Sequence, residues 1–224
     1  YGWTDHIPVV HKGMADIEHH MLHFLENHDE QRIASPEFVG NAQLGKPAMV
    51  VSATISTSPT MIYFGQEVGE PGAEDAGFGK PSRTSIFDYI GVPHHQRWVN
   101  NKKFDGGQLS EEEKDLRDFY KRLLNFTINS EALMGAYQEI HFYNKDHTEN
   151  EKLIVLSNFD AEKSYSLDLK VPEDVIAKWK LTDGTYPLTE RLYQRIKPKL
   201  EVNNGQGQVQ VQLQPLESFI FRLP

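Results

Sequence analysis

The sequence contains no cysteine among its 224 residues, which excludes disulfides, thiolate metal sites and a cysteine nucleophile. It also lacks an apolar run close to the ~20 residues that a membrane-spanning helix needs. Positive charge is scarce, because 23 Lys and Arg stand against 32 Asp and Glu and give a net charge of −9. This balance argues against nucleic acid and anionic membranes as partners. No nucleic-acid or membrane partner is therefore expected, whereas neutral substrates stay open.

The remaining composition is that of an ordinary globular protein, with 38% hydrophobic and 25% charged residues. A chain of this length is expected to form one or two domains. It begins at Tyr1 rather than at Met, and no basic segment followed by an apolar one opens it. We therefore expect the chain to be part of a longer protein.

The first half alternates short apolar runs with helical signals. Residues 21–26 and 61–64 are apolar runs bounded by polar clusters, a pattern typical of buried parallel strands. Residues 48–57 follow Pro47 and favour a buried helix. Residues 70–104 are rich in glycine and proline, and a connection of this length is often functional.

The strongest helical signal starts at Ser110, which forms a capping box with Glu113. Apolar and other side chains then recur with helical period on one face, at Leu116, Phe119, Tyr120, Leu123, Leu124 and Thr127. The order strand, helix, strand, helix indicates a parallel sheet covered by helices. Two such units cannot close a sheet alone, which again indicates a missing N-terminal part.

After about residue 135 the pattern changes to short strands separated by turns. The predicted strands are residues 139–143, 153–158, 165–171, 175–181, 209–213 and 218–223. Turns are predicted at residues 144–150, 183–184 and 203–207. Several strands at short spacing favour an antiparallel β-sandwich of about 90 residues.

The first candidate for chemistry is the tripeptide Asn27-His28-Asp29, which follows the predicted strand 21–26. Ligands bind at the carboxyl ends of strands in barrels and open α/β sheets. A carboxylate beside an imidazole and an amide could orient sugar hydroxyls and stabilise positive charge. The same residues also suit an ordinary turn at the end of a strand, and spacing alone favours that second interpretation.

Three segments in order resemble motifs of one enzyme family. Phe24-Leu25-Glu26-Asn27-His28-Asp29 resembles the fourth sequence motif of the α-amylase superfamily of retaining glycoside hydrolases. The stretch from Pro59 to Glu67 resembles the eighth barrel strand of that family. The stretch from Leu153 to Phe159 resembles a strand of its C-terminal β-sandwich. The resemblance covers nearly the whole chain.

This resemblance implies an α/β part followed by an all-β part. Residues 1–134 are expected to form the last two βα units of a (β/α)8 TIM barrel. Residues 135–224 are expected to form a C-terminal antiparallel β-sandwich. The implied activity is hydrolysis of α-glucans such as starch and maltooligosaccharides by a retaining mechanism. The implied partners are such a substrate and the missing N-terminal half of the barrel.

The resemblance also assigns roles to single residues. Asp29 is similar to the third carboxylate of the family, which stabilises the transition state by binding hydroxyls of the sugar that is cleaved. His28 and Asn27 are its neighbours in the motif, and we expect both to bind substrate. Arg32 is expected either to hold a carboxylate or to line the site.

The chain departs from the family pattern in one important respect. Retaining hydrolysis needs a nucleophile and an acid/base carboxylate about 5–5.5 Å apart, and in this family both come from barrel strands that precede these residues. No Gly-x-Arg-x-Asp pattern occurs in the sequence. The chain alone is therefore predicted to be inactive. No metal site or cofactor is expected within it, whereas the resemblance implies calcium in a full-length relative.

Two other classes of function stay open. The chain could be a non-catalytic carbohydrate-binding or assembly module that kept the amylase scaffold, or an interaction protein that pairs through an exposed half-barrel. His19, His20 and His23 could form a metal cluster, since one helical turn separates His19 from His23. They match no known metal pattern such as H-E-x-x-H, so packing or solvent contact is favoured.

Overall fold

The computed structural model of the chain describes residues 3–73, 84, 91–135 and 151–224. Its α-helices are α1 (His6–Gly13), α2 (Lys46–Thr54), α3 (Pro93–Val99), α4 (Glu111–Thr127) and α5 (Glu173–Lys178). Its strands are β1 (Leu153–Ser157), β2 (Tyr165–Val171), β3 (Gly184–Pro187), β4 (Thr189–Glu190), β5 (Lys199–Asn203), β6 (Gln206–Leu213) and β7 (Ser218–Arg222). No helix of the described residues is long and apolar enough to cross a membrane.

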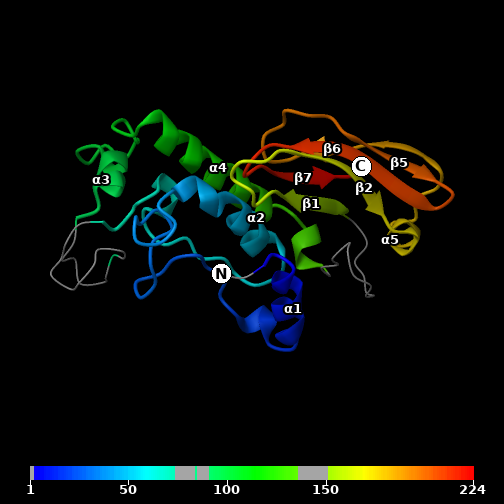
Figure 1. Cartoon of the computed structure of the whole chain (residues 1–224), viewed down its shortest axis with the longest axis horizontal. Helices are drawn as coiled ribbons and strands as arrows, with labels where there is room; N and C mark the ends of the chain where they lie inside the picture. The colour runs from blue at the N-terminus through cyan, green and yellow to red at the C-terminus, as the bar shows by residue number, and fades with distance from the viewer. Residues whose placement is uncertain (1–2, 74–83, 85–90, 136–150) are drawn as a thin grey trace.

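The strands form two antiparallel sheets at one end of the molecule (Figure 1). One sheet has the order β1-β7-β4 and the other the order β2-β6-β5-β3. Apolar side chains of both sheets and of α5 form one buried cluster, which includes Ile154, Ile176, Val209 and Phe221. Two antiparallel sheets around a shared core confirm the β-rich C-terminal part that the strand pattern predicts.

The hairpin between β5 and β6 shows how local sequence sets the register. Asn204 and Gly205 both have positive φ angles, 50° and 75°, and this conformation favours Asn and Gly in two-residue hairpin turns. Asn203 pairs with Gln206 directly across the turn. On β6 the glutamines then point outward and Val209, Val211 and Leu213 point inward, as their alternation predicts.

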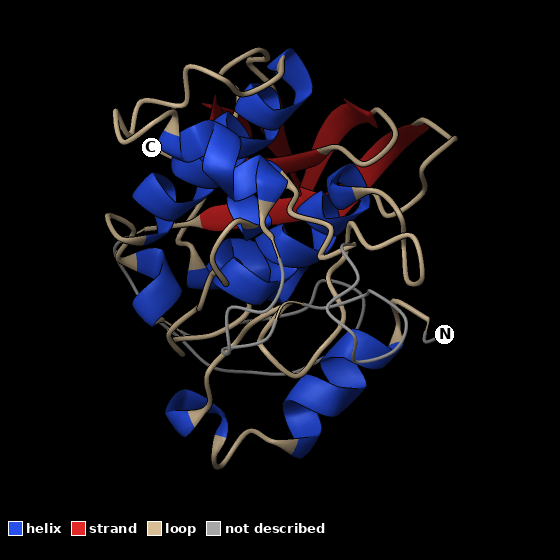
Figure 2. Ribbon diagram, turned by 90° about the vertical axis from the view of Figure 1, so that its left-hand side faces the viewer, coloured by secondary structure: helices blue, strands red, loops and turns tan. Residues whose placement is uncertain are grey.

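Helices α2 and α4 pack against the outer face of the β1-β7-β4 sheet. Their buried side chains, among them Met49 and Leu123, form a second cluster with Ile220 of β7. On the same strand, Phe219 and Phe221 point into the sandwich core. Strand β7 is therefore buried on both faces and joins the helical part to the sandwich. Seen from the helical end, helices lie in front of the strands (Figure 2).

The capping box predicted at Ser110 and Glu113 is confirmed. The Ser110 hydroxyl accepts from the Glu113 amide at 3.2 Å, and the Glu113 carboxylate accepts from the Ser110 amide at 2.8 Å. The same carboxylate also accepts from Arg97 Nε at 3.1 Å and lies 2.8 Å from His94 Nδ1. Glu113 therefore starts α4 and also ties α3 to it.

We predict that Glu113→Gln lowers the free energy of unfolding by about 1–3 kcal/mol at pH 7, since it removes charge-assisted hydrogen bonds. Burial opposes ionisation, but hydrogen bonds from Arg97 and the Ser110 amide lower the pKa of Glu113 below 4.5. The stabilisation is therefore present above pH 4.5 and is lost as the pH falls through the lower pKa of the folded protein. Urea unfolding between pH 3 and 7 measures this effect. Equal losses in the neighbouring, exposed variant Glu112→Gln would contradict it.

The two predicted parallel strands are neighbours, but they pair only briefly. His23 and Thr60 form an isolated parallel bridge. The His23 amide donates to the Pro59 carbonyl at 2.9 Å, and the Met61 amide donates to the His23 carbonyl at 2.8 Å. The chain at His23 therefore runs parallel to the chain at Thr60 and Met61, but neither residues 21–26 nor residues 61–64 form a strand. The rest of each predicted strand is irregular, and the barrel end itself stays a proposal.

One predicted strand is wrong, because residues 175–181 lie mostly in helix α5. Pro172 stands at the N-cap, Glu173 and Asp174 occupy the first turn, and Lys178 occupies the last. Acidic residues in the first turn and a basic residue in the last turn favour a helix through its dipole. The apolar pair Val175 and Ile176 favours a strand as well, and the strand prediction rests on that pair. Strand 139–143 and turn 144–150 lie outside the described residues.

Candidate functional site

The loop that follows the His23 bridge is organised by Asn27. Its side-chain carbonyl accepts hydrogen bonds from the amides of Asp29 and Glu30, both at 2.8 Å. Asn and Asp favour such turns because their short side chains can satisfy backbone amides nearby. Asn27 therefore fixes the backbone from which the next two side chains project.

His28 and Asp29 project from this loop as an adjacent pair. His28 Nε2 lies 3.3 Å from Asp29 Oδ2, and the side chains are 48% and 74% exposed. The structure thus brings three of the predicted site residues together, with Asn27 inside the turn and the other two facing solvent. An exposed carboxylate beside an imidazole can accept and donate hydrogen bonds to hydroxyl groups of a ligand.

Arg32 has a different environment, because its side chain is fully buried. Its Nη1 donates to Glu26 at 2.8 Å, and its Nη2 donates to the Phe64 carbonyl at 2.8 Å. Both Nε and Nη2 donate to the Thr84 hydroxyl, at 3.0 and 2.6 Å. In this arrangement Arg32 holds a carboxylate, one of the two roles expected from its position, and reaches no solvent. Substrate contact by Arg32 stays a prediction.

Glu26 completes the buried pair. Its second carboxylate oxygen accepts from the Ile33 amide at 2.8 Å, so it closes the loop of residues 27–32 at both ends. Burial raises the pKa of Glu26, while the hydrogen bond and charge of Arg32 oppose the rise. Sequence reasoning missed this role, although a carboxylate within an apolar run six residues before an arginine was the available signal.

A second buried carboxylate lies at the end of the neighbouring segment. Glu70 accepts from the amides of His94 and His95 at 3.0 and 3.2 Å and thereby caps the start of α3. Gly65 has φ of 79°, and a Cβ there would lie 2.9 Å from the Glu70 Cβ, so glycine permits this turn. These contacts place α3 beside the end of segment 61–64.

Helix α3 adds aromatic side chains beside that segment. The His95 ring lies 5.6 Å from the ring of Phe64 and 5.9 Å from that of Trp98. The Trp98 ring is in turn 6.0 Å from that of Phe104. These side chains pack on one another. Residues 74–83 and 85–90 of the glycine-rich stretch lie outside the described residues.

The three neighbouring histidines do not form a metal site. His23 Nδ1 lies 3.0 Å from the Ser52 carbonyl, and its Nε2 lies 3.5 Å from Glu18. His19 and His20 contact each other, with ring centroids 4.0 Å apart. Within the described ranges, no group of three or more His, Asp or Glu side chains is arranged to hold a metal ion.

Comparison with known proteins identifies the fold. No family model and no curated protein matches the sequence. The structure is similar to the α-amylase from Geobacillus thermoleovorans, solved with acarbose, with a TM-score of 0.61 and 16% identity over 96% of this chain. It is also similar to the γ-CGTase from alkalophilic Bacillus clarkii and to a maltogenic α-amylase from Thermotoga neapolitana. Their TM-scores are 0.55 and 0.53, each with 14% identity over 95% of this chain.

The chain spans 41%, 28% and 44% of the lengths of these three proteins. The resemblance to the α-amylase superfamily that the sequence motifs indicate is thus confirmed at the level of fold. This chain has the fold of the C-terminal part of amylase-like proteins, with its β-rich sandwich. The division at residue 134 and the roles of Asn27, His28, Asp29 and Arg32 stay predictions.

Proposed function

We propose that this chain supplies the last two βα units and the C-terminal sandwich of an amylase-like glycoside hydrolase acting on α-glucans with retention. The observation that carries the proposal is the loop of residues 27–32, which presents Asp29 and His28 beside a parallel pair of segments. The fold shared with α-amylase, CGTase and maltogenic amylase supports it. The substrate class is taken from those proteins by analogy.

In this proposal Asp29 binds hydroxyls of the sugar ring that is cleaved. The reaction passes through an oxocarbenium-like transition state, so a fixed negative charge beside the ring favours it electrostatically. Hydrogen bonds from the ring hydroxyls to Asp29 and His28 also help to distort the sugar. The nucleophile and the acid/base carboxylate belong to upstream strands of the barrel.

Arg32 and Glu26 act as positioning residues in the same proposal. Their ion pair and the bond from the Ile33 amide to Glu26 hold both ends of the Asn27 loop, and both side chains are buried. A displacement of about 1 Å at a reacting group can cost ~10²-fold in rate. An exposed carboxylate that binds substrate therefore requires a rigid, buried support.

The test compares this chain with a longer protein that also contains its upstream segment. We expect the longer protein to release reducing sugar from maltooligosaccharides, with the α-anomer of the product formed first in proton NMR spectra. The 224-residue chain should release none, because both reacting carboxylates are absent from it. Binding without hydrolysis by both proteins would instead support the carbohydrate-binding module. Hydrolysis by the chain alone would contradict the proposal.

A further inference from the structure

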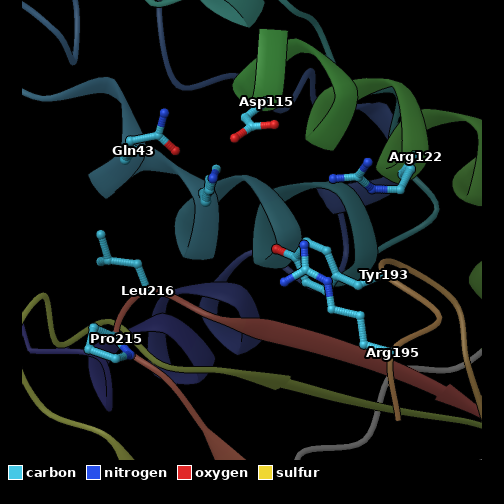
Figure 3. A pocket seen from close by; sticks show the side chains of 8 residues that line it. Gln43, Asp115, Arg122, Tyr193, Arg195, Pro215 and Leu216 are labelled. Atoms are coloured by element: carbon cyan, nitrogen blue, oxygen red, sulfur yellow. The ribbon is translucent and has the colours of Figure 1, made fainter. Parts of the chain in front are cut away.

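A pocket of about 290 Å³ lies where helices α2 and α4 meet the sandwich, and no role is assigned to it above. Figure 3 shows side chains from four separate parts of the chain around it. Lys46 begins α2, Asp115 and Arg122 lie two turns apart on α4, and Tyr193 and Arg195 follow strand β4. Gln43, Pro215 and Leu216 complete the lining.

The pocket concentrates positive charge in an acidic protein. Lys46, Arg122 and Arg195 face a single carboxylate, Asp115, although the chain as a whole carries a net charge of −9. Within the described residues, none of these three cations has an ion-pair partner within 4.0 Å or a hydrogen bond. The Nε of Arg122 is buried and has no hydrogen-bond partner among the described residues. Buried donors are almost always paired in folded proteins, so this Nε, together with the two neighbouring cations, is available to a ligand.

The charge of the lining favours an anion over a neutral sugar. Lys46, Arg122 and Arg195 only donate hydrogen bonds, and these three cations outnumber the one carboxylate of the lining, Asp115. The Tyr193 ring, the one aromatic surface, is already contacted by the guanidinium carbons of Arg122 and Arg195 at 5.3 and 5.0 Å. Guanidinium groups match the oxygens of a phosphate with paired hydrogen bonds.

Lys46, Arg122 and Arg195 carry like charges that repel one another. Burial lowers the pKa of Lys46, and the nearby charges of Arg122 and Arg195 lower it further, while Asp115 and Glu112 oppose this. A bound dianion would relieve that repulsion. It would also join α2, α4 and the loop after β4, which are held together otherwise by the apolar cluster around Ile220.

We propose that this pocket binds a phosphate-class oxyanion through Lys46, Arg122 and Arg195, and that the anion fastens the helices to the sandwich. The ligand is either free phosphate or the phosphate group of a phosphorylated sugar. The site is distant in the sequence from Asp29, and the proposal does not depend on the glycosidase function.

The test is isothermal titration calorimetry of the 224-residue chain at constant ionic strength, with inorganic phosphate, glucose 6-phosphate and glucose as probes. We expect saturable 1:1 binding of phosphate and an increase in Tm with phosphate concentration. Arg122→Gln and Arg195→Gln should each weaken binding about tenfold or more. Lys170→Gln, which removes an exposed charge from β2, should leave the affinity unchanged.

The other outcomes either identify the source of the phosphate group or contradict the proposed site. Tighter binding of glucose 6-phosphate than of phosphate identifies a phosphorylated sugar, and equal binding identifies free phosphate. Absence of saturable heat would overturn the proposal, as would equal affinities in the two arginine variants and the Lys170 control. Glucose binding as tightly as glucose 6-phosphate would also overturn it. Because Arg195 is exposed, its variant keeps the test valid if Arg122→Gln does not fold.

Discussion

Replacing Arg32 by methionine is expected to lower the free energy of unfolding by about 3–5 kcal/mol, since it leaves a buried charge without its partner. Glu26, which is 2% exposed, would lose the guanidinium that lies 2.8 Å from its carboxylate. The Phe64 carbonyl and the Thr84 hydroxyl would lose their donor as well. Urea unfolding at pH 7, followed by circular dichroism, measures the loss.

The double variant Arg32→Met with Glu26→Gln is the matched control. Because it removes both charges, most of the lost stability should return. The amide oxygen of the glutamine can still accept from the Ile33 amide that Glu26 now binds. A double variant as unstable as Arg32→Met would show that packing, rather than the unpaired charge, determines the effect.

The sequence predicted the elements that are set by interactions between neighbouring residues. The capping box at Ser110 located α4, and alternation along residues 208–212 located β6, because in both cases neighbouring residues set the pattern. The sequence pattern did not predict helix α5, because the apolar pair Val175 and Ile176 suits a strand as well as a helix. Its identity follows from packing, because both side chains are buried in the sandwich core.

The candidate site likewise has one part that the sequence predicts and one part that it does not. The tripeptide Asn27-His28-Asp29 is contiguous, so its turn could be predicted from residue types alone. The support beneath it could not, because Arg32 bonds to residues 32 and 52 positions away along the chain. Only the folded structure shows that this arginine lies inside the protein beneath the loop. The pocket proposed to bind an anion likewise combines residues from four separated segments.

Asp29→Asn, in the longer protein that contains the upstream barrel residues, is expected to reduce kcat on maltooligosaccharides by about 10²–10³-fold, the typical cost of one electrostatic contact to the transition state. Stability should change little, because the side chain is 74% exposed. Asparagine keeps the size of the side chain but lacks the negative charge beside the developing oxocarbenium ion.

The most direct test of the account is therefore kcat for Asp29→Asn beside Asp118→Asn, which makes the same change on the exposed face of α4. We expect a loss of two to three orders of magnitude in the first variant, ordinary activity in the second, and unchanged unfolding curves in both. Normal turnover by folded Asp29→Asn would contradict the role of this carboxylate in the reaction.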